Sequence, residues 1–131
     1  MAVLEQIKAH LEANGFEGRV FLSGGVPNVP PFPYLMVYSL QPVASRSLAR
    51  SEGARRFRFG VTVCDLSARY VESDADRVES VLEGSRVLGS LSRIEWVARG
   101  PESRDPEVTI DGAEVHTLPI HFTATIPRGA A

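Results

Sequence analysis

The chain has 131 residues, close to the commonest size of a protein domain, so we expect one domain over residues 1–131. Hydrophobic residues make up 44% of the chain and charged residues 23%, which excludes a disordered or fibrous protein. The net charge of -2 gives no overall attraction to nucleic acid, and no apolar stretch approaches the ~20 residues of a membrane span. We therefore expect no membrane association and a protein that stays in the cytoplasm where it is made. The single Cys64 lies in an apolar run, which favours a buried thiol over a reactive one.

The chain begins with a predicted helix, a short strand and a long loop. Apolar residues recur at helical spacing from Val3 to Leu11, and Gly15 favours a left-handed stop. Residues 19–22 predict a brief strand. Glycines and prolines then exclude regular structure over residues 23–33, which predicts a stiff loop.

The middle of the chain contains two predicted strands separated by a second loop. Residues 34–40 are almost continuously apolar, which predicts a central strand buried on both sides. Residues 41–53 are polar and arginine-bearing, which suits a segment that is exposed or ordered by a partner. Residues 55–64 alternate, with Phe57 to Val63 on the packed face and arginines on the other.

A second amphipathic helix is predicted from a cap at Ser73 or Asp74 to about Leu88. Asp74 and Asp76 then fall in its first turn. Catalytic carboxylates are the alternative explanation of this pair, but capping and the helix dipole account for both residues.

The C-terminal part of the chain is predicted to be strands. Residues 94–98 and 108–110 form two short ones joined by a polar turn at 100–106, and residues 114–126 form the longest. The apolar parity of this last strand matches that of residues 57–63, so we expect the two to pair antiparallel. The predicted class is α+β, with a mixed, mostly antiparallel β-sheet and two helices packed on one face.

No pattern typical of catalysis or cofactor binding occurs. His116 and His121 are five residues apart on one strand and therefore face opposite sides of it. Gly24 and Gly25 are not followed by the lysine and hydroxyl residue of a phosphate loop. Trp96, in a predicted strand, is interpreted as a core or interface residue rather than a ligand-stacking one. We expect no metal, no cofactor and no enzymatic activity.

A basic cluster is the candidate interaction site. It lies on the second loop and on the outward face of the strand that follows. Three explanations stay open, namely a solvated loop, a docking surface for an acidic partner subunit, and contact with nucleic-acid phosphates. A nucleic-acid module would add net positive charge or interleaved exposed aromatic residues. The cluster consists of Arg46, Arg50, Arg55, Arg56 and Arg58.

The order and spacing of these segments resemble a known family over nearly the whole chain. The matching features are a short helix ending at Asn14-Gly15, a Gly/Pro-rich loop leading into residues 33–38, a long loop before residues 56–63, a helix containing residues 75–82, and a closing strand ending at residues 121–125. In these features the chain resembles the tail terminator proteins of long-tailed bacteriophages, the lambda gpU-like group.

The resemblance implies a structural virion protein without an active site. Its expected state is a homo-oligomeric ring, a hexamer in this family, at the head-proximal, neck-side end of the tail. The implied partners are the tail tube protein on one side and a neck or head-completion protein on the other, with DNA passing through the lumen without specific binding. We expect the loops at residues 23–33 and 41–53 to reach neighbouring copies. Another neck protein, or a small nucleic-acid-binding α+β module, remains the alternative.

Overall fold

The computed structural model describes residues 3–27, 30–40, 54–89, 92–100, 103–110 and 113–127, which hold two helices and six strands. The elements are α1 (Val3–Ala13), β1 (Val20–Leu22), β2 (Tyr34–Leu40), β3 (Ala54–Asp65), α3 (Ala68–Leu82), β4 (Arg93–Arg99), β5 (Ser103–Ile110) and β6 (Ala113–Pro127).

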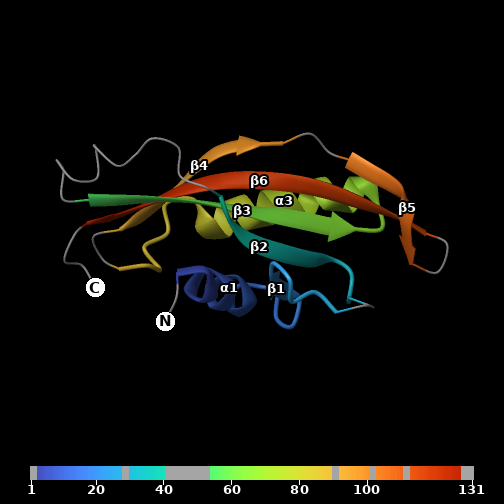
Figure 1. Cartoon of the computed structure of the whole chain (residues 1–131), viewed down its shortest axis with the longest axis horizontal. Coiled ribbons are helices and arrows are strands. Elements are labelled where there is room, and N and C mark those ends of the chain that lie inside the picture. Colours follow the sequence, from blue (N-terminus) through green and yellow to red (C-terminus); the bar gives the residue numbers. More distant parts are fainter. Residues whose placement is uncertain are drawn as a thin grey trace.

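The strands form one sheet in the order β1-β2-β3-β6-β4, and β5 pairs with the start of β6 (Figure 1). β1 and β2 run parallel, whereas all other pairs are antiparallel. The predicted pairing of β3 with β6 is confirmed, because Val61 lies opposite Ile120 and Phe59 opposite Phe122. The α+β class with a mixed, mostly antiparallel sheet is likewise confirmed.

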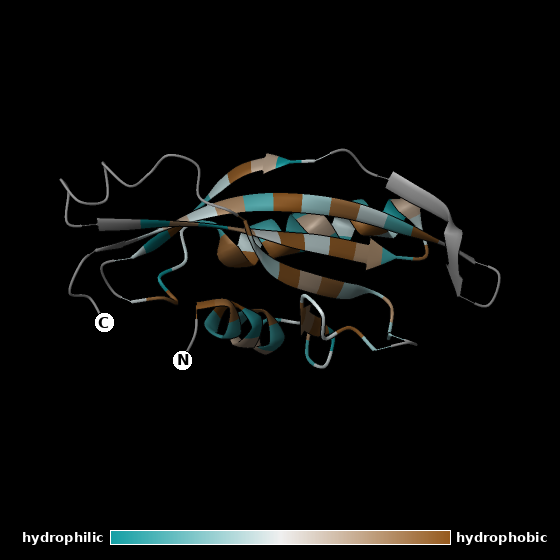
Figure 2. Cartoon of the chain, viewed as in Figure 1, coloured by the Kyte–Doolittle hydropathy of each residue, from teal (hydrophilic) through white to brown (hydrophobic). Residues whose placement is uncertain are grey.

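One face of the sheet carries the hydrophobic core. Apolar and polar residues alternate along β3 and β6 (Figure 2), so that every second side chain points to the same side. Both helices pack on this side, as predicted, with α3 over β3 and β6 and α1 beside β1 and β2 (Figure 1). Fully buried residues from both layers include Ile7, Leu11, Val37, Phe59, Val61, Val71, Val78, Leu82, Ile120 and Phe122.

The opposite side of the sheet is covered by no helix within the described residues, and we call it the open face. Along β2, Leu35 and Val37 are fully buried, but Tyr34, Met36 and Tyr38 are only half-buried. The prediction that this strand is buried on both sides is therefore wrong. It failed because tyrosine and methionine are apolar enough to resemble core residues while lying on a half-exposed sheet surface.

The second helix begins and ends earlier than predicted. Its N-cap is Ser67, and it ends at Leu82, where Glu83 leaves the helical conformation and Gly84 adopts a positive φ of 76°. Asp74 and Asp76 therefore lie within the helix and do not cap it. The error arose because serine and aspartate favour the cap position but also occur inside helices. The length of α3 is instead determined by the row of residues that it buries against the sheet.

The loop at residues 23–33 has an explanation within the chain. Parallel neighbouring strands need a connection that returns over the full strand length, and this loop joins β1 to the parallel β2. Arg19 fastens its end by donating from Nη1 to the carbonyl oxygens of Phe32 (2.6 Å) and Pro33 (3.2 Å). Its length is therefore no evidence for contact with a neighbouring copy. The second loop, residues 41–53, lies outside the described residues.

The two C-terminal short strands are longer than predicted. β5 begins at Ser103 rather than at residue 108, so the predicted turn at 100–106 is partly strand. The sequence pattern missed the first part of β5 because it contains Pro106, and proline is rare inside strands. Here it lies where the pairing with β6 shifts register between Asp105 and Thr109, an irregularity of the kind that tolerates proline.

Candidate interaction surfaces

Part of the predicted arginine cluster lies on the open face. Arg56 and Arg58 alternate along β3 with the partly buried Phe57 and the fully buried Phe59, which places the two arginines on the side away from the helices. Arg55 lies in β3, but its side chain is outside the described part of the structure. Arg46 and Arg50 lie outside the described residues altogether. Of the five predicted residues, the structure therefore places Arg56 and Arg58 together on one face of the sheet.

The register adds a third arginine that the sequence pattern did not reveal. Arg56 pairs with Thr125 of β6, and Thr125 pairs with Arg93 of β4, so the three residues form one row across the sheet. Two strand spacings place the Arg56 and Arg93 backbones about 10 Å apart. We call Arg56, Arg58 and Arg93 the basic strip. None of the three forms an ion pair within the described part of the chain.

The outer edge of the sheet at β4 is closed by the chain that follows α3. Ile94 donates to the Ser85 carbonyl oxygen (3.1 Å), and Gly84 donates to the Ile94 carbonyl oxygen (2.8 Å). The Trp96 N–H donates to the Glu83 carboxylate. A free strand edge is a template for pairing with another chain, so these bonds prevent strand addition along this part of β4.

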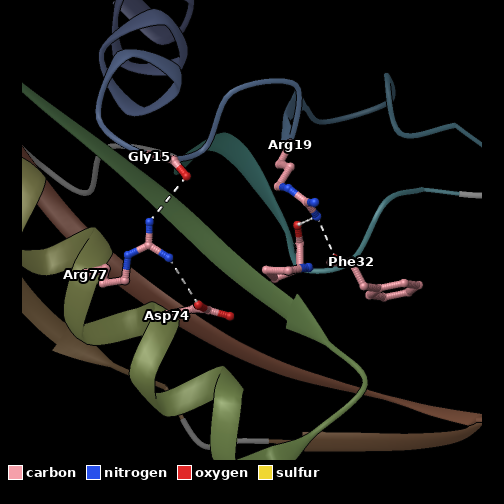
Figure 3. Close-up of polar contacts among 6 residues, drawn as sticks. Gly15, Arg19, Phe32, Asp74 and Arg77 are labelled. Atoms are coloured by element: carbon pink, nitrogen blue, oxygen red, sulfur yellow. Dashed lines mark hydrogen bonds and ion pairs between the residues drawn. The ribbon is translucent and has the colours of Figure 1, made fainter.

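Arg77 links α3 to the turn after α1 (Figure 3). Arg77 donates to the Gly15 carbonyl oxygen (3.3 Å), lies 3.7 Å from an Asp74 carboxylate oxygen, and stacks on the Phe16 ring at 4.5 Å. The other Asp74 oxygen is buried without a donor among the described residues, beside the Asp65 carboxyl group. Two carboxyl groups hydrogen-bond to one another only when one carries a proton.

This environment raises the pKa of the Asp74 carboxyl to about 6. Burial is the largest cause, and hydrogen bonding and charge from Asp65 add to it, while Arg77 and Arg19 oppose it. The charged groups near this pair have structural partners: Arg77 fastens α3 to the turn after α1, and Arg19 holds the end of the loop before β2. An Asp65 carboxylate oxygen accepts from the Leu66 N–H (2.6 Å). We interpret the carboxyl pair as a structural contact.

The remaining candidates for chemistry are the Cys64 thiol and two histidines of β6. Burial raises the pKa of the Cys64 thiol to about 11, so the predicted buried thiol is confirmed and carries almost no thiolate at neutral pH. His116 pairs with Asp65 and His121 with Gly60, which places the two histidines at opposite parity, as predicted. Across the described residues, no three His, Cys, Asp or Glu side chains form a group that could hold a metal ion.

Solved structures with this architecture identify the fold. A chain of the virion of a native gene transfer agent particle matches with a TM-score of 0.66 and 16% sequence identity, over 95% of this chain and 94% of its own. A second solved chain matches with a TM-score of 0.56 and 20% identity, over 93% of this chain and 94% of its own. No family model and no curated protein matches this chain in sequence. No helix in the described ranges is long and apolar enough to cross a membrane.

Proposed function

We propose that this chain is a structural virion protein of the tail terminator type. Six copies form a closed ring on the head-proximal end of a tail tube, end tube polymerisation and join the tail to the neck. The ring needs no active site and no cofactor, and DNA passes through its lumen. The observation that supports this proposal most strongly is the similarity in fold to a chain of a gene transfer agent virion, because the similarity extends over nearly the full length of both chains.

The open face supports a docking role within this proposal. A two-layer fold with helices on one side leaves a broad sheet surface that a partner can cover. Its basic strip offers three guanidinium groups that form no ion pair with another described residue, and these suit carboxylates of an acidic partner surface. We assign this face to the tail tube, with Arg46, Arg50 and Arg55 as further candidates for the same contact.

Addition of the purified protein to its cognate tail-tube subunits during polymerisation tests the proposal. We expect tubes that stop growing at one end and carry a ring-shaped density there in electron micrographs. Tubes that grow to the same lengths with and without the protein, and that carry no ring, would contradict the proposal.

A nucleic-acid-binding module is the second candidate, and one observation favours it. Tyr34 and Tyr38 lie four residues apart on β2, so both face the open side of the sheet, the side that carries Arg58. However, a Cβ atom built on Gly60 would lie 2.4 Å from the Tyr38 ring, so this ring already packs on the sheet beneath it. Salt-dependent binding of a fluorescent single-stranded oligonucleotide at submicromolar concentration would support this candidate over the first.

A further inference from the structure

A row of apolar side chains follows β2 on the open face. Every second residue of the strand points to this side and is half-buried, whereas Leu35 and Val37 between them are fully buried. Phe21 of β1 pairs with Met36 and therefore joins the row. At about 3.3 Å per residue, the row is about 20 Å long. We call it the apolar ridge, and it consists of Phe21, Tyr34, Met36, Tyr38 and Leu40.

Ring contacts hold the first part of the ridge in place. The centroid of the Tyr34 ring lies 5.4 Å from that of Phe32 and 6.1 Å from that of Phe21. Arg19 fixes the position of Phe32 through its backbone carbonyl oxygen (2.6 Å). Side chains that are already ordered lose little conformational entropy when a partner covers them, so this part of the ridge is suited to docking.

The Tyr38 ring is held flat on the sheet. It lies over Gly60, where a side chain of any other residue would collide with the ring. Its hydroxyl oxygen accepts from the Thr62 hydroxyl (3.3 Å). One face of the ring packs on β3, and the half-buried ring continues the apolar surface of the ridge.

The basic strip meets the apolar ridge at one end. Leu40, the last residue of the ridge, pairs with Arg58, and Arg56 and Arg93 lie farther from the ridge on β3 and β4. Glu95, two residues after Arg93, is on the same face. Three guanidinium groups and one carboxylate give this end of the face a net positive charge. The open face therefore combines an apolar row with a basic border at one end, an arrangement typical of protein–protein contacts.

The most exposed large hydrophobic side chains among the described residues are not part of this surface. Trp96 is 47% exposed, so it is not the core residue that one of the two interpretations expected. Its pairing with Phe122 places it on the side of the sheet that the helices cover. Leu66 and Tyr70 lie at the corner between β3 and α3. The apolar ridge is thus the apolar surface that borders the basic strip.

From these observations we infer that the apolar ridge is the centre of the tube-docking contact, and that the tube presents an apolar surface with carboxylates at one end. The inference rests on the proposed function and names the chemistry of its docking partner. The carboxylates face the basic strip at the Leu40 end of the ridge and fix the orientation of docking. A ring repeats the contact in every copy, so a modest affinity per copy is sufficient.

Single-stranded nucleic acid is the alternative occupant of a surface with aromatic and basic residues. Bases stack on the exposed faces of aromatic rings. Met36 and Leu40 offer no ring, and one face of the Tyr38 ring is already covered by Gly60. An apolar protein surface fits these side chains better.

Met36→Thr combined with Leu40→Thr tests the ridge in co-sedimentation with preformed tubes. Threonine is favoured in strands, so the variant should keep the sheet. It should bind tubes at least about tenfold more weakly than wild type at both roughly 0.05 and 0.5 M salt, because salt does not screen the apolar contacts that it loses. Ser39→Thr, exposed on the opposite face of the same strand, is the matched control and should bind like wild type.

Oxidation of Met36 in the wild-type protein is a second measurement, and it does not depend on the folding of a variant. Hydrogen peroxide transfers one oxygen atom to an accessible methionine thioether, and mass spectrometry of peptides measures the product. Met36 should react in the free protein and lose most of its reactivity when the protein is bound to tubes.

Three results would overturn the ridge as the centre of the contact: wild-type binding by the double variant, a loss of binding confined to low salt, or equal Met36 oxidation with and without tubes. If wild type still caps tubes in that case, the proposed function stands and only this contact is wrong. A wild type that neither binds nor caps tubes contradicts both. If such a protein binds a fluorescent single-stranded oligonucleotide at submicromolar concentration and the double variant does not, the ridge is a nucleic-acid site instead.

Discussion

At the scale of single residues, Asp74 makes stability depend on pH. Its pKa is near 3.9 in the unfolded chain and about 6 in the folded one, so the folded state holds the proton more tightly. The stabilisation from protonated Asp74 is fully present below about pH 4 and is lost as the pH rises through 6. Ionised Asp74 therefore lowers the free energy of unfolding at neutral pH.

Asp74→Asn should remove this loss of stability at neutral pH. The Asn amide has its own N–H donors, so it can hydrogen-bond to the Asp65 carboxylate without taking up a proton. Relative to wild type, the variant is expected to gain on the order of 2 kcal/mol in unfolding free energy between pH 4 and pH 7.5. Urea unfolding followed by circular dichroism at several pH values measures the difference. Glu72→Gln, at an exposed position of the same helix, should keep the wild-type profile. Parallel profiles for Asp74→Asn and wild type would show that Asp74 ionises normally.

At the scale of elements, the sheet and α3 meet through a stacked aromatic pair. The Phe59 and Phe122 rings of β3 and β6 lie 5.3 Å apart, and both residues are fully buried. Phe122→Ala should lower the unfolding free energy by about 3–5 kcal/mol, because it leaves a cavity under the helix. Phe57→Ala, at a partly buried position of the same strand face, should cost clearly less in the same urea titration. Equal losses would mean that the core extends beyond the pair.

The closed edge of β4 is the second feature at this scale that an experiment can address. Glu83→Ala removes the acceptor of the Trp96 N–H, and loss of about 1 kcal/mol of local protection should make that amide exchange with solvent about fivefold faster. Hydrogen-exchange NMR measures the rate, with Glu17→Ala in an exposed turn as the control. Unchanged exchange at Trp96 would mean that the carboxylate does not close this edge.

How far the sequence predicts these elements depends on how many faces of each one are buried. β3 and β6 each have one buried and one open face, so their alternation predicted both the strands and their pairing. The open face of β2 was not predicted, because Tyr34, Met36 and Tyr38 on that face are apolar enough to resemble core residues. The basic strip was predicted only within β3, since Arg93 joins it through the register of β4 with β6, which local patterns do not specify.

At the scale of the whole molecule, the proposed function assigns tube docking to the open face. The basic strip lies there, on the side of the sheet away from both helices. Arg56→Glu combined with Arg58→Glu reverses two charges of the strip and leaves the buried side of β3 unchanged.

The reversed variant should form rings of wild-type mass yet bind tail tubes at least about tenfold more weakly, because charge-paired guanidinium groups would face like charges or lose their partners. Wild-type binding should also weaken as salt rises from roughly 0.05 to 0.5 M, since the Debye length then falls well below 10 Å. Co-sedimentation with preformed tubes measures both effects, and Glu17→Lys controls for a charge reversal elsewhere. Rings that cap tubes normally despite the reversal would remove the open face from the docking surface, and the tube would then have to contact the helical side or an end of the sheet.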